Sequence, residues 1–541
     1  MSFLRRAFSV VDKPPLPPSQ GKGGLFARGR LLLLSLSSVL TAGLVCLSFP
    51  RYSHAGLAWI ALVPFFWGII KIRSFWASFF YGWITSFLFH AGLFYWIYYT
   101  CRHGGGLPVG LSLAAWLGLC ALLSVQMAVF GGSCYFLKKG GYFFALLAGC
   151  AFVTLEWFHQ MLAFYGLGFP WLMWGYSQWN VIPVLQVAAY TGVYGISFVL
   201  VFVNALLGKA CSKGFCKGSI GCALAAVGCI LFLFVWGGRQ VPSVVMHENS
   251  RFQPLLSVSA AIMQPNIDQY KKWNEAFEQE ITDTLKQQGA ELEGQNVMLT
   301  VWPESALPGE LLEEEYSNLM TDITQKSGSY QVIGSAIVQE DQQFVGAYLI
   351  DPAGELQSYK KIKLVPFGEY LPAGQLLRRI LPQADIMGQA GEFMAGDLKQ
   401  PLLNAGGVLL GTTICYESIF PQVWRMQNKQ GAKLFVNLTN DAWYFNTAAP
   451  YQHLAANVLR AVEVRRPVLR SANTGISAVI DPFGRILQRT DLFVRTWLRA
   501  QVPLQISDKQ SVYTRWGDWF AWLCAILFMT GIIPLMVFAY D

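Results

Sequence analysis

The chain has 541 residues, of which 54% are apolar, 15% are aromatic and 13% are charged. Soluble globular domains carry about 25% charged residues, so this composition argues against a wholly soluble protein and favours a chain embedded in a membrane. The net charge of +8 falls mostly in short loops, as described below, and does not indicate a nucleic-acid partner.

Eight apolar runs predict membrane-spanning helices. Most of them approach or exceed the roughly 20 residues that a spanning helix needs, while the second is short and depends on its flanks. We therefore expect a cytoplasmic tail at 1–30, a seven-helix transmembrane domain at 31–237, an outer domain at 238–517 and a C-terminal helix at 518–541. The runs cover residues 31–49, 57–71, 74–99, 107–137, 141–158, 181–208, 220–237 and 519–540.

Lysine and arginine in the short loops predict the orientation, because these residues resist translocation across the membrane. With the N-terminus in the cytoplasm, thirteen basic residues lie on the cytoplasmic side, and only Arg51 and Arg102 lie on the opposite side. This asymmetry places the segment 238–517 outside the membrane. It also accounts for the positive net charge.

The outer segment alternates between short β-rich runs and polar stretches. A polar-faced helix is expected at 271–289, ended by a glycine, and the sequence DPAG marks a turn between two strands. Buried strands interleaved with helices predict an α/β layered domain, in which functional groups lie where strands end. The strand candidates cover residues 255–267, 296–308, 330–340, 344–362, 406–420, 432–443 and 466–487.

Cys415 is the only cysteine of the outer segment, because the other ten lie in the predicted spans or at their ends. A disulfide within the outer domain is therefore excluded, although the compartment outside the membrane is oxidising. A lone exported thiol is either a small buried hydrophobe or a group kept for chemistry. The residues around it decide between these alternatives.

Three of the runs end in groups that can act together on an acyl carbonyl, namely Glu304, Lys361 and Cys415. A thiol with a pKa of about 8.5 is mostly protonated at neutral pH, so a carboxylate acting as general base must remove its proton. A lysine ammonium then stabilises the oxyanion of the tetrahedral intermediate. A Cys–His pair is possible only through His453, and zinc ligation is poorly supported because the segment has one other histidine, His247. No cofactor is expected.

Three motifs around these residues resemble the nitrilase superfamily, whose α-β-β-α sandwich uses a Glu-Lys-Cys triad. They are WPES around Glu304, YKKIKLVPFGEYLP around Lys361 and ICYESIFP around Cys415. The eight predicted spans, together with the stretches MQPNIDQYKKWNE and GFPWLMWGYSQ, are similar to one branch of that superfamily, the apolipoprotein N-acyltransferases of bacterial inner membranes. The resemblance implies a bundle of eight transmembrane helices that carries an extracytoplasmic α/β nitrilase-like domain.

The resemblance also implies roles for individual residues. Cys415 is the expected nucleophile, Glu304 the general base and Lys361 the cation that stabilises the oxyanion. Lys360 and Lys363 are close competitors for the last role, but the spacing from the LVPFGE motif favours Lys361. The alternative is that Glu304 and Lys361 form an ordinary surface ion pair. The residues expected to orient these groups or to bind substrate are Trp273, Glu369, Tyr416, Glu417 and Trp443.

Further side chains leave two interpretations open. The aromatic residues near Cys415 can face the bilayer as interfacial anchors or pack in the core. Glu156, inside the fifth predicted span, can serve a lipid head group or helix packing. The aromatic residues in question are Phe420, Trp424, Trp443, Tyr444 and Phe445.

Three positions depart from the pattern of the family that the chain resembles. Family members commonly have an asparagine at the position of Val345, an arginine at the position of His159, and Phe-Gly where this chain has Tyr444 and Phe445. These departures bear on the loops and on the fit of the lipid, and they leave the three reacting groups unchanged.

The resemblance implies a two-step, ping-pong acyl transfer by a monomer in the inner membrane, with its catalytic domain on the periplasmic side. Cys415 takes an acyl chain from a phospholipid, and the thioester passes it to the α-amine of the diacylglyceryl-cysteine of an apolipoprotein. A transporter and a membrane-tethered amidase are the alternatives. The scarcity of charged residues in the spans and the lack of a repeat between the two halves of the sequence argue against the transporter, and the eight-span frame argues against the amidase.

Overall fold

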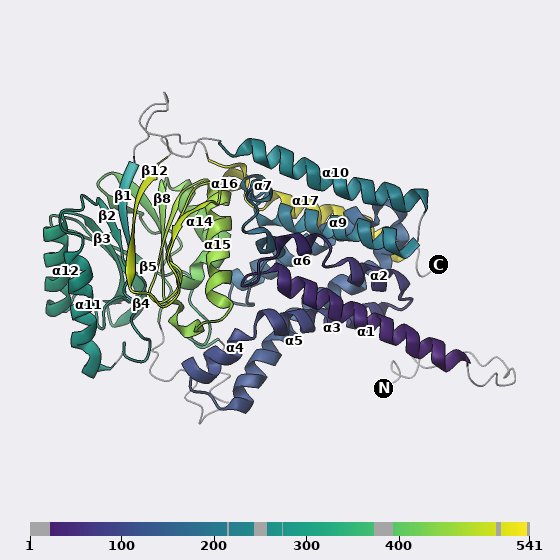
Figure 1. The fold of residues 1–541 in the computed structure, drawn as a ribbon, viewed down its shortest axis with the longest axis horizontal. Coiled ribbons are helices and arrows are strands. Elements are labelled where there is room, and N and C mark those ends of the chain that lie inside the picture. The colour runs from purple at the N-terminus through teal and green to yellow at the C-terminus, as the bar shows by residue number, and fades with distance from the viewer. Residues whose placement is uncertain are drawn as a thin grey trace.

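The computed structural model describes residues 22–213, 216–242, 257–272, 274–372, 393–504 and 510–537. Long helices form one end of an elongated molecule and two stacked β-sheets form the other (Figure 1). The predicted residues Trp273 and His247 lie outside the described residues, so the structure does not place them.

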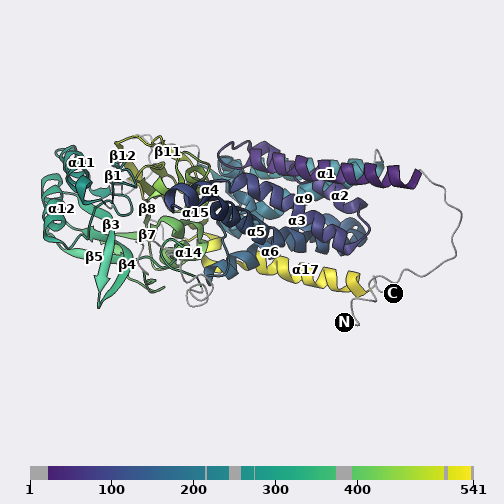
Figure 2. The ribbon, with the colours of Figure 1, turned by 90° about the horizontal axis from the view of Figure 1, so that it is seen from below.

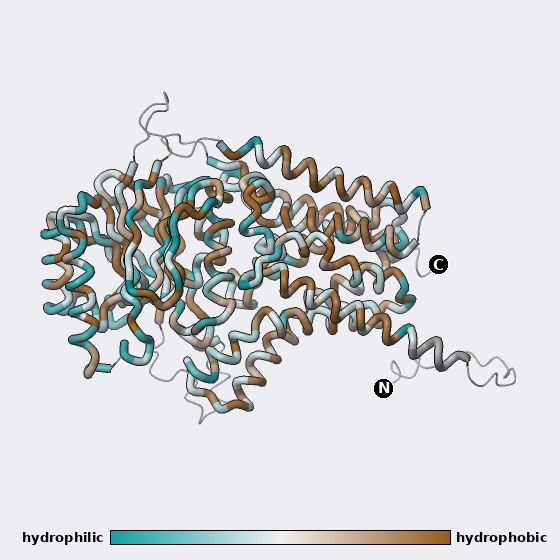
Figure 3. The backbone as a smooth tube through the Cα atoms, in the orientation of Figure 1, coloured by the Kyte–Doolittle hydropathy of each residue, from teal (hydrophilic) through white to brown (hydrophobic). Residues whose placement is uncertain are grey.

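The helical end consists of long apolar helices that run side by side (Figure 2), and apolar residues dominate them (Figure 3). Several present large apolar side chains outward, such as Leu32 on the first helix and Leu224 on a later one. A helix that is apolar on all sides is typical of a membrane span. The helices are α1 (Lys22–Ser48), α2 (Val63–Lys71), α3 (Phe75–Leu93), α5 (Val109–Leu137), α6 (Phe144–Phe164), α9 (Val193–Lys213), α10 (Lys217–Gln240) and α17 (Trp519–Val537).

The structure refines two of the predicted spans. Among the described residues, five helical segments are long and apolar enough to cross a membrane, and one of them, Val109–Phe164, contains both α5 and α6. The run 57–71 yields only the nine-residue α2 after a short 3₁₀ helix at Ala55–Trp59, which is less than half the length that a span needs. The eight-span count therefore stays a prediction.

The run 181–208 does not form one helix, which corrects the expectation from its apolar composition. It divides into α7 (Ile182–Leu185), α8 (Ala188–Thr191) and α9. Gly192 separates the last two with a φ of 67°, a conformation that glycine adopts without steric cost. A Cβ at this position would lie 2.6 Å from the ring of Tyr513, so tertiary packing, which the local sequence does not reveal, sets the break.

The other end of the molecule contains two six-stranded sheets. Their strand orders are β12-β1-β2-β3-β4-β5 and β11-β10-β9-β8-β7-β6. In each sheet three central strands are parallel, β1 to β3 and β7 to β9, and the outer pairs are antiparallel. The strands are β1 (Ser257–Gln264), β2 (Leu299–Val301), β3 (Tyr330–Gln339), β4 (Gln342–Ile350), β5 (Leu356–Lys360), β6 (Leu403–Ala405), β7 (Val408–Ile414), β8 (Leu434–Thr439), β9 (Val468–Ala472), β10 (Ala478–Ile480), β11 (Ile486–Arg489) and β12 (Thr496–Pro503).

Helices cover the outer face of each sheet and complete the predicted α-β-β-α sandwich. Along β1, Ala260 and Ile262 join the core between the sheets, whereas Ala261 and Met263 pack on the opposite face with α11 (Glu278–Ala290) and α12 (Glu314–Ser327). This alternation is the two-residue period of a strand that is buried on both faces. On the second sheet, α14 (Pro421–Lys429) and α15 (Ala449–Val464) lie toward the membrane helices (Figure 1).

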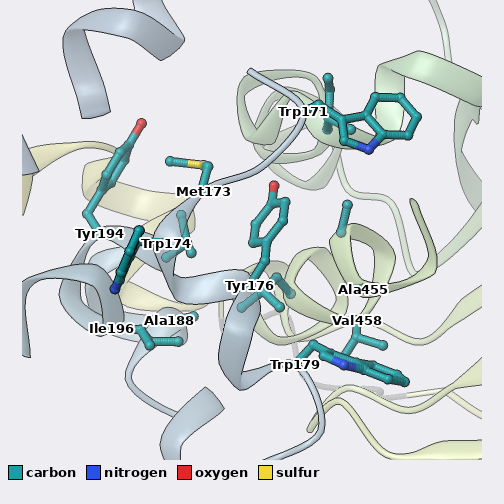
Figure 4. Packing of buried hydrophobic residues seen from close by; sticks show 14 of the residues in the cluster. Trp171, Met173, Trp174, Tyr176, Trp179, Ala188, Tyr194, Ile196, Ala455 and Val458 are labelled. Atoms are coloured by element: carbon teal, nitrogen blue, oxygen red, sulfur yellow. The ribbon is translucent and has the colours of Figure 1, made fainter. Parts of the chain in front are cut away.

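The sandwich and the helical end meet along α15. The segment 170–179, which follows α6, is packed between them, and Figure 4 shows its side chains beside Ala455 and Val458 of α15. Trp171 donates a hydrogen bond from Nε1 to Gln452 Oε1 at 3.0 Å. This buried contact joins the segment that follows α6 to α15, which lies between the second sheet and the long helices (Figure 1).

Candidate active site

The predicted reacting groups all follow strands. Glu304 lies three residues after β2, while Lys361 and Cys415 come directly after β5 and β7. Cys415 opens a 3₁₀ helix, Cys415–Ile419, and Asn440 follows the neighbouring parallel strand β8. Carboxyl ends of parallel strands meet at one edge of a sheet, and stacking of the two sheets brings the groups from both of them together.

A buried ion pair joins the carboxylate to the lysine. Lys361 Nζ lies 3.1 Å from Glu304 Oε1, and the Lys361 side chain is fully buried. The second oxygen, Glu304 Oε2, accepts a hydrogen bond from the backbone N–H of Asn440 at 3.0 Å. The expectation of an ordinary surface pair is therefore wrong, because both charges are removed from solvent. A buried pair of this kind holds one fixed geometry.

Cys415 is buried next to this pair. Its φ is 49°, a left-handed conformation that non-glycine residues adopt rarely and that occurs often at functional sites. Burial raises the pKa of the thiol, the Glu304 carboxylate raises it further, and Lys361 offsets only part of the increase. The thiol is thus protonated at neutral pH, so nucleophilic attack requires a base close by. The Thr439 side chain hydrogen-bonds to it.

Glu369 completes the surroundings of Lys361. Its Oε1 lies 2.5 Å from Lys361 Nζ, while its Oε2 accepts from the backbone N–H of Val365 at 2.8 Å. Burial opposes the charge of Lys361, but Glu304 and Glu369 outweigh it and raise the pKa of the ammonium. Burial raises the pKa of Glu369 despite the adjacent lysine. Lys361 is therefore a permanently charged group held by two carboxylates.

The two competing lysines point elsewhere. Lys360 Nζ donates to Gln339 Oε1 at 2.5 Å and lies over a phenylalanine ring of β4. Lys363 Nζ donates to the backbone oxygen of Phe164 at 2.6 Å, at the end of α6. Among these three lysines, only Lys361 contacts the Glu304 carboxylate in the described part of the chain.

Glu417 occupies a scaffolding position two residues after Cys415. Its carboxylate accepts backbone N–H groups of Ile362 at 2.5 Å, Lys363 at 3.1 Å and Ile414 at 2.7 Å. Tyr359 donates its hydroxyl to the same carboxylate at 3.1 Å. Burial raises the pKa of Glu417 to about 7, against the effect of these hydrogen bonds. Glu417 thus ties the segment that carries Lys361 to the segment that carries Cys415.

A second polar network behind Cys415 was not predicted from the sequence. Asp441 Oδ2 accepts from Arg470 Nη2 at 2.7 Å, and Asp441 Oδ1 lies 2.8 Å from His453 Nδ1. His453 Nε2 lies 3.0 Å from the backbone oxygen of Cys415. His453 therefore contacts the backbone carbonyl of Cys415, while the thiol contacts other groups. This geometry does not match the alternative of a Cys–His pair.

The charges in this network stabilise one another. Burial opposes the charge of Asp441, yet Arg470 and His453 outweigh burial and lower the pKa of the carboxyl group. Burial and the nearby Arg470 lower the pKa of His453, which keeps the imidazole neutral. In the sequence, Asp441 stands in the stretch NDAW, and its partners Arg470 and His453 lie on β9 and α15.

Lys272 is another buried cation that sequence reasoning did not single out. It is 1% exposed, and its Nζ donates to the backbone oxygen of Glu304 at 3.4 Å. Burial lowers the pKa of Lys272 to about 8, with Glu304 acting in the opposite direction. It therefore sits behind the backbone of the candidate base.

The aromatic residues near Cys415 divide between the two interpretations. Phe420, Trp424 and Tyr444 are buried, whereas Trp443 is 39% exposed and Phe445 is half-buried. Tyr416 stacks on Phe169, with ring centroids 6.0 Å apart. Core packing thus accounts for most of the group, and Trp443 remains a candidate for contact with lipid. In the described residues, no group of three or more His, Cys, Asp or Glu side chains could hold a metal ion.

Comparisons with known proteins agree with this architecture. The family model for carbon-nitrogen hydrolases matches residues 259–508, and that for the apolipoprotein N-acyltransferase N-terminal domain matches residues 41–206. Among solved structures, the chain is similar to a carbon-nitrogen hydrolase from Helicobacter pylori G27 at 14% identity and a TM-score of 0.37, covering 49% of this chain and 94% of that one. The family-model matches identify the sandwich as a carbon-nitrogen hydrolase domain that follows an N-terminal domain of apolar helices.

Relatives that align with most of the chain identify its family more narrowly than the two domain models do. The apolipoprotein N-acyltransferase of Geobacter metallireducens is 32% identical over 506 residues, which cover 90% of this chain and 92% of the relative. The enzyme of that name from Photobacterium profundum is 28% identical, with 92% and 93% covered. The one from Bdellovibrio bacteriovorus is 30% identical, with 85% of each chain covered. The chain belongs to the apolipoprotein N-acyltransferase family.

Proposed function

We propose that the protein transfers an acyl chain from a membrane phospholipid, through a thioester on Cys415, to the α-amine of the diacylglyceryl-cysteine at the N-terminus of apolipoproteins. The single observation that carries this proposal is the buried contact of Lys361 with Glu304 beside the Cys415 thiol. Membership of the family supports the choice of substrates, and the raised pKa of the thiol supports the need for a base.

In the first step Glu304 removes the proton of the Cys415 thiol as the sulfur attacks the ester carbonyl of the phospholipid. The carbonyl oxygen gains negative charge, which the ammonium of Lys361 stabilises. When the tetrahedral intermediate collapses, the C–O bond of the ester breaks and Glu304 returns its proton to the departing alkoxide. The products are an acyl thioester and a lysophospholipid.

In the second step the neutral α-amine of the acceptor attacks the thioester carbonyl. Glu304 takes a proton from the attacking nitrogen, and Lys361 again stabilises the oxyanion. Collapse breaks the C–S bond, the Cys415 sulfur recovers its proton from Glu304, and an amide is released. Because Glu304 returns each proton within the step in which it was taken up, the cycle needs no cofactor.

The neighbouring residues support these steps in different ways. Glu369 keeps Lys361 charged and fixed, and Glu417 holds together the loops that carry Lys361 and Cys415. We assign Tyr416 to the wall of the acyl pocket and Trp443 to its exposed rim. We also assign Trp273 to orienting the reacting groups or lining the acyl pocket, on the resemblance of the stretch MQPNIDQYKKWNE.

We further propose that eight helices cross the inner membrane, with α2 completed by its flanks, and that the sandwich lies on the periplasmic side. The distribution of lysine and arginine in the loops supports this orientation. Both substrates are lipids, and packing of α15 against the segment 170–179 keeps the reacting groups close to the membrane helices. The proposed enzyme acts as a monomer.

The experiment that tests the function measures both products. The purified protein is incubated with a phospholipid of defined chains and a diacylglyceryl-cysteine lipopeptide, and the N-acylated peptide and the lysophospholipid are quantified by mass spectrometry. The proposal predicts equal amounts of both. Release of free fatty acid without N-acylated peptide would instead indicate a hydrolase, and the absence of both products would favour the transporter.

A further inference from the structure

A polar cavity of about 50 Å³ lies inside the helical end, away from Cys415. It is enclosed by α3, α5, α6 and the segment 170–174, and its polar lining comes mainly from α6. Such a cavity is unusual among apolar helices, because polar groups inside a membrane domain are costly and mark functional sites. The polar lining residues are His90, Gln126, Glu156, His159 and Gln160.

Two hydrogen-bond acceptors in this cavity are left unused. Glu156 Oε1 accepts from the backbone N–H of Trp174 at 2.6 Å, and Ser197 also approaches the carboxylate. Glu156 Oε2 and Gln160 Oε1 have no hydrogen-bond partner among the described residues, although Glu156 is 6% exposed and Gln160 1% exposed. Buried polar atoms without a partner are rare in native proteins and call for an explanation.

The arrangement fits a ligand that donates hydrogen bonds and carries positive charge. The amide oxygen of Gln160 only accepts hydrogen bonds, and so do both oxygens of Glu156 when the carboxylate is ionised. A metal ion is a poor match, since in the described residues no set of three His, Cys, Asp or Glu side chains could hold one. We propose that this cavity binds a primary ammonium group, held between Glu156 and Gln160.

The cavity lies where such a group can reach it and where it can influence the reaction. Glu156 and Gln160 lie within the last three turns of α6, which is the depth of the outer leaflet in the proposed orientation. His159 and Gln126 are partly exposed and mark its accessible side. Gln160 Nε2 donates to the backbone oxygen of Ile419 at 3.3 Å, in the 3₁₀ helix that begins at Cys415.

A primary ammonium has two sources in the proposed reaction, on which this inference rests. One is the ethanolamine head group of the phospholipid donor, and the other is the N-terminus of the acceptor. A choline head group has the same charge but no N–H, so the cavity should discriminate between the two head groups. A glycerol head group has donors but no positive charge.

The first test uses binding, which does not depend on acyl transfer. In a Cys415→Ala background, native mass spectrometry compares the retention of phosphatidylethanolamine, phosphatidylcholine and phosphatidylglycerol with identical chains. We expect phosphatidylethanolamine to be retained about tenfold better than the other two, and the preference to disappear in Glu156→Gln. That variant keeps the acceptor for Trp174 N–H, so the fold is preserved. Equal retention of all three lipids by the parent protein would exclude the donor head group as the source, and together with an unchanged lipopeptide KM in Glu156→Gln it would overturn the site.

The second test uses rates of thioester formation and amide formation. The ratio of rates with phosphatidylethanolamine and phosphatidylglycerol should fall about tenfold in Glu156→Gln, the size expected when one charge-assisted hydrogen bond is lost. His159→Arg should lower the ratio too, because its guanidinium would compete for Glu156. A selective rise in the KM of the lipopeptide would assign the ammonium to the acceptor and still support the site.

Glu463→Gln is the matched control, since Glu463 is also a buried carboxylate that accepts a backbone N–H, from Val193 at 2.9 Å, but it does not line the cavity. We expect the donor ratio of this variant to equal that of the parent. Equal loss with every donor in Glu156→Gln, with the KM of the lipopeptide unchanged, would mean a purely structural role and would overturn the inference. Absence of any thioester in the parent protein would overturn the proposed function, whereas the binding test would still decide the site.

Discussion

Two buried ion pairs in this protein each join a basic side chain to a glutamate, but their surroundings differ. Arg460 and Glu463 lie three residues apart on α15, with Arg460 Nε 3.1 Å from Glu463 Oε2, and Glu463 also caps the start of α9. Lys361 instead lies between two carboxylates. Glu304 follows β2 of the same sheet, and Glu369 lies eight residues after Lys361 along the chain. The first pair connects two domains.

The second pair differs because it is unbalanced and faces a thiol. Two carboxylates share one cation, and the pKa of the nearby Cys415 is raised by burial and by Glu304. A cluster that gathers a carboxylate, an ammonium and a thiol from three strand ends is suited to chemistry, whereas a pair within one helix braces an interface. Substitutions that remove one partner from each pair should separate these two functions.

The largest effect is expected for Lys361→Met. Loss of the ammonium should lower acyl transfer about 100- to 1000-fold, the cost of one donor to an oxyanion. It also leaves Glu304 and Glu369 buried without a cation, which should destabilise the fold by about 3–5 kcal/mol. Activity assays and urea denaturation check both effects. Lys360→Met is the control, and an equal loss in that variant would contradict the assignment of Lys361.

Arg460→Met should affect stability far more than chemistry. It leaves Glu463 buried and unpaired, which should cost about 3–5 kcal/mol of unfolding free energy. Activity per folded molecule should stay near that of the parent, because the residue lies away from Cys415. Lys326→Met, which breaks an exposed pair with Asp322, should change the unfolding free energy far less, because water and salt screen exposed pairs. A catalytic defect without loss of stability would refute the comparison.

Glu417 should make stability depend on pH. Burial raises its pKa to about 7 in the folded state, above the unfolded value of about 4.3. The folded state therefore binds the proton more tightly, and the stability that this proton contributes is present at low pH and is lost as pH rises from about 4 through 7. Relative to Glu417→Gln, the parent should lose roughly 1–3 kcal/mol between pH 5 and pH 8.

Chemical denaturation at several pH values measures that difference, and the double comparison cancels the other titrating groups. His453 acts in the opposite direction, because its lowered pKa removes stability as pH falls below about 6.5. A difference between parent and Glu417→Gln that is the same at every pH would show that Glu417 does not titrate in this range.

The smallest effect is expected for Lys363→Met. Lys363 donates to the backbone oxygen of Phe164 and its ammonium lies 3.5 Å from the centroid of that ring. Losing both contacts should lower the unfolding free energy by about 1 kcal/mol. Lys399→Met, at an exposed position, should change it by less than about 0.5 kcal/mol. A thermal-shift series that finds the two variants equal would exclude a role for this contact.

The sequence was informative where short motifs and strand ends coincide. Glu304, Lys361 and Cys415 could be proposed together because each closes an apolar run. The α/β layered domain followed from alternating strands and helices, and its α-β-β-α arrangement was implied by the family resemblance. The sequence predicted for Glu417 only that it orients the reacting groups or binds substrate. Its actual partners could not be predicted, because the backbone N–H groups that it binds come from two separate loops.

The remaining features depend on contacts between distant parts of the chain. Arg470 reaches Asp441 only because β8 and β9 are adjacent and in register. The break at Gly192 depends on the ring of Tyr513, which lies far along the sequence. Apolar composition likewise predicted one continuous helix at 181–208, because composition does not record where a helix must end to pack against a second domain.

The most direct test of the central claim is the intact mass of the protein after brief exposure to phospholipid in the absence of an acceptor. We expect the mass to increase by one acyl chain, on a peptide that contains Cys415, and the adduct to disappear when the lipopeptide amine is added. The Cys415→Ala variant should show neither adduct nor N-acylated product. Full N-acylation by a folded Cys415→Ala variant would contradict the account.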